Sequence, residues 1–106
     1  MPLGGNMGDM MKHARKLQED LARLQSDLKD RVVEGSAGGG VVTAMANGRQ
    51  ELVALKLDKQ VIDPGEADML QDLVLAACNV ALAKSRQMVE TEMGKLTGGL
   101  KLPGMP

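Results

Sequence analysis

The sequence contains no Phe, Tyr or Trp, whereas nine of its 106 residues are Met. A core without aromatic side chains has to be built from Leu, Val, Ala and Met, which suits helix packing better than a β-sandwich. Missing aromatic rings also remove the platforms on which single-stranded nucleic acids stack. The composition therefore disfavours OB-fold and RRM-like RNA binders.

Cysteine and histidine are also scarce, with one residue of each kind. Cys78 has no partner for a disulfide within the chain, and His13 has no cysteine or second histidine nearby for a metal site. We expect no metal and no cofactor. The charge-free apolar run at 73–83 is too short to span a bilayer, and residues 1–12 lack the apolar region of a secretion signal. These features predict a cytoplasmic protein without a membrane partner.

An excess of positive charge is missing as well, because the formal net charge is −1. Proteins that bind nucleic acid are commonly basic, so any such activity here must come from local patches. Basic residues are in surplus near the start of the first predicted helix and near the end of the second, whereas residues 51–72 are mainly acidic. The cations could meet phosphates, although an ordinary solvated helix surface gives the same pattern.

Residues 7–30 carry a heptad pattern, in which apolar side chains recur at alternating steps of three and four. The pattern predicts a helix from about 9 to 30, with Asp9 as its N-cap. The remaining positions are densely charged, so only a narrow strip can be buried, and a second helix or a second subunit must cover it. The strip consists of Met7, Met10, Ala14, Leu17, Leu21, Leu24 and Leu28.

The chain changes to a strand-like pattern after this helix. Asn47-Gly48 separates two β-rich runs and predicts a type I′ hairpin turn, in which both central residues have φ > 0. We expect strands near 31–35, 40–46 and 49–57. Asp63-Pro64 then predicts the start of a better buried helix at about 64–94, because Asp is a good N-cap and Pro suits the first helical position.

The glycine-rich stretch GSAGGGVV at 35–42 has the G-x-x-x-x-G spacing with which a phosphate-binding loop begins, from Gly35 to Gly40. Val41 and Val42 stand where such a loop needs Lys and then Ser or Thr, and the glycines lead into a strand instead of a helix. We therefore interpret Gly38–Gly40 as a tight or bulged connection between strands. A small-ligand site at this turn is the weaker alternative. No nucleophile and base can be paired along the chain, so we predict that the protein is not an enzyme.

Several separated segments strongly resemble the YbaB/EbfC family of bacterial nucleoid-associated proteins, over residues 7–105. The resemblance rests on EGSAGGGVV, the Asn47-Gly48 turn followed by LVALKLD, the helix start at Asp63-Pro64 with DMLQDLVLAACNVALAKS, and the closing EMGKLTGGLKLPGMP. It implies an α+β fold of order α-β-β-β-α, with a small antiparallel sheet flanked by two long helices in a tweezer-like homodimer. We divide the chain into a flexible N-terminus (1–8), a single DNA-binding and dimerisation domain (9–94) and a Gly/Pro-rich flexible tail (95–106).

The resemblance also implies that projecting helices grip double-stranded DNA in the nucleoid through phosphate contacts, with little sequence specificity, and so affect nucleoid organisation and gene expression. The alternative is a protein-interaction module of the DNA replication or recombination machinery, docking through the apolar seam and the tail. The candidate DNA-binding residues are chosen by charge and position. They are Lys12, Arg15, Lys16 and Arg23 in the first helix, and Lys84 and Arg86 in the second.

Overall fold

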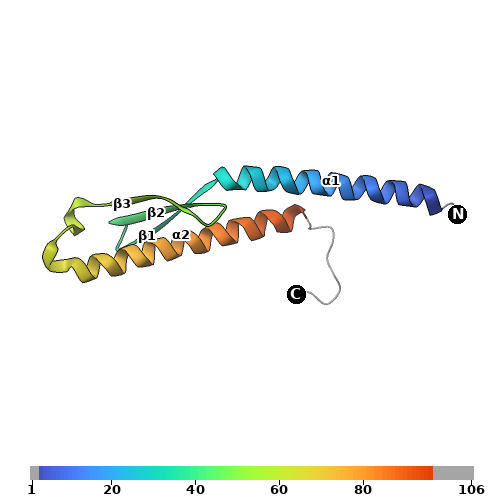
Figure 1. Cartoon of the computed structure of the whole chain (residues 1–106). Coiled ribbons are helices and arrows are strands. Elements are labelled where there is room, and N and C mark those ends of the chain that lie inside the picture. Colours follow the sequence, from blue (N-terminus) through green and yellow to red (C-terminus); the bar gives the residue numbers. More distant parts are fainter. Residues whose placement is uncertain (1–2, 97–106) are drawn as a thin grey trace, which may run out of the picture.

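A long helix, a three-stranded sheet and a second long helix follow one another along the chain (Figure 1). The computed structural model describes residues 3–96, and the side chains of residues 7–96. The elements are α1 (Leu3–Asp30), β1 (Val32–Ala37), β2 (Val42–Asn47), β3 (Leu52–Leu57) and α2 (Ala67–Leu96), with single 3-10 turns at Lys59–Val61 and Pro64–Glu66. This order confirms the α-β-β-β-α prediction. The molecule is elongated, with principal extents of 78 × 29 × 16 Å.

Both helices extend beyond the bounds that the sequence predicted. Helix α1 begins at Leu3, so Asp9 lies inside the helix and its predicted role as N-cap is wrong. The three-and-four spacing continues back through Met7 to Leu3, which explains the earlier start. Helix α2 continues to Leu96. The flexibility of residues 1–8 and 95–106 stays a prediction. Of these two segments, residues 1, 2 and 97–106 lie outside the described part of the chain.

The start of α2 follows the predicted signal with a short offset. The Asp63 carboxylate accepts a hydrogen bond from the backbone N–H of Gly65 at 3.0 Å, and Pro64 occupies the first position of the turn that follows. That turn is 3-10, and α2 itself begins three residues later, at Ala67. Along residues 3–96, neither helix is long and apolar enough to cross a membrane.

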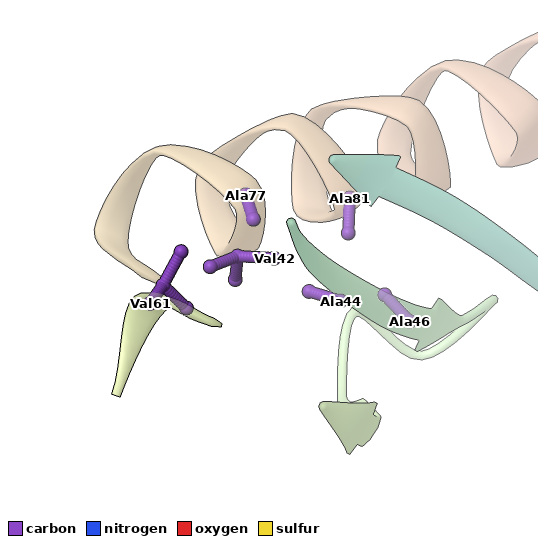
Figure 2. Close-up of a cluster of buried hydrophobic side chains, with 6 residues drawn as sticks. All are labelled: Val42, Ala44, Ala46, Val61, Ala77 and Ala81. Carbon is purple, nitrogen blue, oxygen red and sulfur yellow. The ribbon is translucent and has the colours of Figure 1, made fainter. Parts of the chain in front are cut away.

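The three strands form an antiparallel meander in the order β1-β2-β3, and α2 packs across β1 and β2. Figure 2 shows Ala77 and Ala81 of α2 beside the side chains of Val42 and Ala44 in β2. These small side chains let the helix approach the sheet closely. A Cβ atom built on Gly35 of β1 would overlap the backbone nitrogen of Ala81, so this glycine fixes the helix–sheet distance.

The loop between β1 and β2 confirms the interpretation of the glycine-rich stretch. Gly38, Gly39 and Gly40 have φ values of 65°, 76° and 99°, in the left-handed region that glycine adopts without strain. The N–H of Gly40 donates to the carbonyl of Ala37 at 3.3 Å and closes the turn. These glycines therefore connect two strands, as expected.

The predicted type I′ turn at Asn47-Gly48 is wrong. The loop is longer, β2 ends at Asn47 and β3 starts at Leu52, and the residue with positive φ in this loop is Gln50, at 59°. Asn47 builds the loop with its side chain, since its Oδ1 accepts from the backbone N–H of Arg49 at 2.9 Å and of Glu51 at 3.1 Å.

Gly48 is needed for packing against α1. Its N–H donates to the carbonyl oxygen of Leu28 at 3.0 Å, and a Cβ atom at Gly48 would overlap that oxygen. Leu28 is fully buried at this contact. The buried hydroxyl of Ser85 in α2 donates to the carbonyl of Asn47, which ties the same loop to the second helix. The β2–β3 loop thus joins the C-terminal end of α1 to the middle of α2.

Candidate nucleic-acid interface

The N-terminal part of α1 projects beyond the end of α2 (Figure 1). All side chains from Met7 to Glu19 are exposed, whereas Leu21 and Leu24 are half-buried and Leu28 is buried. The last turn of α2 lies beside α1 at a shallow groove lined by Asp20, Asp27, Glu92 and Lys95, among others. We call residues 7–19 the arm, because no other helix or strand within residues 3–96 covers this part of α1.

Three predicted DNA-binding residues share one face of the arm. At about 100° of rotation per residue, Lys12, Arg15 and Lys16 fall within an arc of roughly 100°. This arc lies on the side of α1 opposite the apolar positions Met10 and Leu17. All three cations are exposed, and within residues 3–96 none of them forms an ion pair. Two exposed acids, Asp9 and Glu19, lie on or beside the same arc, one turn before and one turn after these cations. The arm therefore presents a charged face on which three cations outnumber two acids, here called the cationic face, and an apolar face.

Arg23 stands apart from these three residues. It lies on a similar side of α1, but its guanidinium is 3.9 Å from the Asp20 carboxylate, and it borders the groove at the end of α2. The pair is exposed and therefore weak. This groove carries three acids, Asp20, Asp27 and Glu92, against two bases, Arg23 and Lys95. The basic surplus predicted for the start of α1 is thus concentrated at residues 12–16.

The two candidates in α2 point in different directions. Lys84 and Arg86 are exposed and flank Ser85, which faces the sheet, so their side chains leave the helix on opposite sides. They lie roughly 200° apart around the axis and cannot meet the same phosphate. Lys84 also lies about 18 Å before the end of α2, away from the arm. Within one protomer the structure does not bring these two residues to Lys12, Arg15 and Lys16.

Two charged features at the base of α1 were missed from the sequence. Glu92 forms ion pairs with Arg31, at 3.2 Å, and with Lys95, at 3.3 Å. These pairs link the chain after α1 to the last turn of α2. Lys29 and Arg49 line an open groove of about 510 Å³ between α1, the β2–β3 loop and α2. The sequence did contain a signal for Lys29, because it lies fourteen residues, or two heptads, after Arg15 and therefore on a similar side of the helix. Nothing in the sequence marked Arg49, because its position depends on the loop docking against α1.

The remaining candidates show no built chemical site. His13 is exposed on the arm, and Cys78 is a half-buried free thiol beside the core. Within residues 3–96, His, Cys, Asp and Glu side chains form no group of three that would hold a metal ion.

Comparisons with known proteins were consistent across the length of the chain. A model of the YbaB/EbfC DNA-binding family matches residues 4–100. A nucleoid-associated protein of Moorella thermoacetica is 57% identical over 100 residues, which cover 94% of this chain and 96% of the relative. A nucleoid-associated protein of Pelotomaculum thermopropionicum is 50% identical over 103 residues, which cover 97% and 98%. The crystal structure of an uncharacterized protein from Helicobacter pylori is similar, with a TM-score of 0.57 and 25% identity over 83% of this chain and 98% of that chain.

Proposed function

This chain belongs to the YbaB/EbfC DNA-binding family, and from that membership we propose that it holds duplex DNA as a homodimer, mainly through phosphate contacts and with little sequence preference. Its role is non-catalytic: it organises DNA in the nucleoid of the cytoplasm and thereby affects gene expression. Phosphate contacts fix a protein on the duplex but carry no sequence information, which fits a surface of cations without aromatic or amide clusters.

The observation that carries this proposal is the cationic face of the arm. Lys12, Arg15 and Lys16 are exposed, share one side of α1 and, in the described part of the chain, have no ion-pair partner. Cations in this state can release the counterions that surround DNA without first breaking an ion pair of their own. A duplex lying against this face would meet all three side chains within little more than one helical turn.

The uncovered apolar surface of β3 supports the homodimer. Leu55 pairs with Ala44 and Leu57 pairs with Val42, so these leucines point to the same side of the sheet as the buried core. Helix α2 covers β1 and β2 but hardly reaches β3, and Leu55 remains 48% exposed. Leu52 and Val53 extend the same apolar edge. A second copy that covers this edge also doubles the number of arms that can contact one duplex.

The test is the variant Lys12→Ala/Arg15→Ala/Lys16→Ala, titrated into a labelled random-sequence duplex and followed by fluorescence anisotropy. We expect affinity to fall roughly tenfold for each cation removed at about 0.1 M salt, and the salt dependence to become shallower. A matched control, Lys56→Glu/Lys59→Ala, removes the same formal charge from β3 and the turn after it. Equal effects of the two variants would contradict a role for the arm and indicate only a general effect of net charge.

One observation favours the second candidate function, a module that docks another protein. Met7, Met10 and Met11 are all more than 60% exposed on the arm, and methionine-rich surfaces adapt to varied partners. This function predicts capture of a replication or recombination protein that survives nuclease treatment and is lost in Met10→Lys. Loss of all captured partners on nuclease treatment would contradict it.

A further inference from the structure

The groove at the base of α1 combines side-chain donors from two elements that are distant in sequence with an apolar floor from a third. Gln25, Ser26 and Lys29 come from the last turns of α1, Arg49 comes from the β2–β3 loop, and Val89 of α2 forms part of the apolar floor. Lysine, arginine, serine and glutamine side chains are among the groups that contact DNA phosphates. We call this feature the basal groove. The groove at the end of α2 differs from it, because three acids there offset two bases.

The two cations of the basal groove are available to a ligand. Within residues 3–96 neither Lys29 nor Arg49 forms an ion pair. The neighbouring acid in the same loop, Glu51, accepts from the side-chain amide of Asn47 at 3.0 Å. The loop itself is held in place, since the backbone N–H of Arg49 donates to Asn47 and the N–H of Gly48 donates to Leu28. Arg49 is therefore presented from a fixed backbone, which lowers the entropic cost of an interaction with a ligand.

The basal groove also lies near one edge of the cationic face of the arm, the edge that carries Arg15. Arg15 and Lys29 are two heptads apart, so they lie within about 40° of each other around α1 and roughly 21 Å apart along it. This separation is close to the width of a DNA duplex and corresponds to several phosphates along one strand, at about 3.4 Å each. A backbone that meets Arg15 on the arm can continue toward Lys29 on the same side of the helix.

We propose that the basal groove is a second contact with the DNA backbone, in which Lys29 and Arg49 each meet a phosphate. This inference rests on the proposed DNA-binding function and adds a site at the opposite end of α1 from the arm. Because Lys29 belongs to α1 and Arg49 to the β2–β3 loop, a bound backbone joins the helix to the body of the protein. DNA then fixes the direction of α1 at the point where it meets the sheet.

The experiment compares the full-length wild type with Lys29→Ala/Arg49→Ala, using anisotropy of a labelled random-sequence duplex between 50 and 200 mM salt. We expect affinity to fall roughly tenfold for each cation removed near 0.1 M salt, and the slope of log K against log salt to decrease by about 0.9 for each phosphate no longer neutralised. The control Lys56→Ala/Lys59→Ala removes the same charge from outside the groove and should bind like the wild type. Circular dichroism checks that the variants keep the helical content of the wild type.

The outcomes separate this inference from the function on which it depends. In one outcome, the Lys29→Ala/Arg49→Ala variant binds with the affinity and salt slope of the wild type while the Lys12→Ala/Arg15→Ala/Lys16→Ala variant binds clearly more weakly. That result would overturn the DNA contact at the basal groove and leave the proposed function intact. Absence of salt-dependent binding by the wild type would overturn both. Should the double variant lose helical content, the charge-retaining variant Lys29→Arg/Arg49→Lys provides the test. It should keep wild-type affinity within a few fold, and a decrease as large as that of the alanine variant would also overturn the proposal.

Discussion

At the scale of single residues, the packing of α2 on the sheet depends on side chains that are small or absent. Ala77, Ala81 and Ser85 recur every four residues along α2 and are its fully buried positions. Ala77 and Ala81 face Gly35, which leaves no room for a side chain against their backbone, and Ser85 faces the carbonyl of Asn47. Tight backbone approach of this kind compensates for the lack of large aromatic side chains, because close-packed atoms gain dispersion energy.

Gly35→Ala should therefore destabilise the protein. The added methyl group would overlap backbone atoms of Ala77 and Ala81, which cannot move aside as a flexible side chain would. Overpacking of a core costs about 1–3 kcal/mol, which corresponds to a decrease in Tm of at least roughly 5 °C for a domain of this size. Circular dichroism at 222 nm measures the melting, since the chain has no aromatic fluorescence.

Gly94→Ala is the matched control for this prediction. A Cβ atom at Gly94 has open space within 4 Å, and the residue lies in α2. Alanine favours helix over glycine by up to about 1 kcal/mol, so this variant should melt at the same or a slightly higher temperature. Unchanged melting of Gly35→Ala would contradict the close approach of β1 and α2.

The glycines also show what the sequence could and could not predict. Gly38–Gly40 were interpreted correctly, because a run of glycines between two strands is a local signal for left-handed backbone. Gly48 was identified as a turn residue but for the wrong reason. Glycine is required at position 48 because a side chain there would overlap the carbonyl of Leu28, twenty residues earlier in the chain. Local sequence patterns do not predict such long-range packing.

At the scale of elements, α1 and β3 each carry apolar side chains that their own protomer leaves uncovered. Along the seam of α1 the exposed fraction rises from 1% at Leu28 to 69% at Met10. The heptad pattern predicted that a partner must cover this seam, and within the protomer α2 does so only at the base. The sequence of β3 did not predict an uncovered apolar edge, because the alternation of side chains does not show which strands of a sheet a helix will cover.

Leu55→Asp should dissociate the proposed homodimer. A charge placed on the apolar edge of β3 would be buried without a partner when a second copy covers it, which costs several kcal/mol. Sedimentation velocity should show a monomer for this variant and a dimer for the wild type at the same concentration. Lys56→Asp is the control, because Lys56 pairs with Thr43 on the other face of the sheet. A dimer that persists in Leu55→Asp would place the interface elsewhere.

At the scale of the whole molecule, charge is separated along the long axis even though the net charge is near zero. The arm carries Lys12, Arg15 and Lys16 against Asp9 and Glu19, whereas Asp58, Asp63, Glu66, Asp68 and Asp72 gather around the start of α2, at the far end of the sheet. Repulsion between these acids and DNA phosphates would keep that end away from the duplex and direct the arm toward it. The overall acidic pI therefore does not by itself exclude DNA binding.

The sequence predicted the part of the candidate site in which all the residues lie on one face of a single helix. Lys12, Arg15 and Lys16 lie on one face because helical periodicity places them there, and the sequence contains that information. Lys84 and Arg86 were chosen by charge and position along the chain, without regard to the helix face, and the structure has them on opposite sides of α2. The basal groove depends on three elements meeting, so only the fold reveals it.

The measurement that tests the central claim most directly is the affinity of the wild-type protein for a labelled random-sequence duplex at 50 and 200 mM salt. Six or more phosphates neutralised by two arms predict a decrease of about 10³-fold or more in affinity between these concentrations. A second duplex of unrelated sequence should behave in the same way. No binding at low salt, or an affinity that does not change with salt, would contradict DNA gripping by the arms.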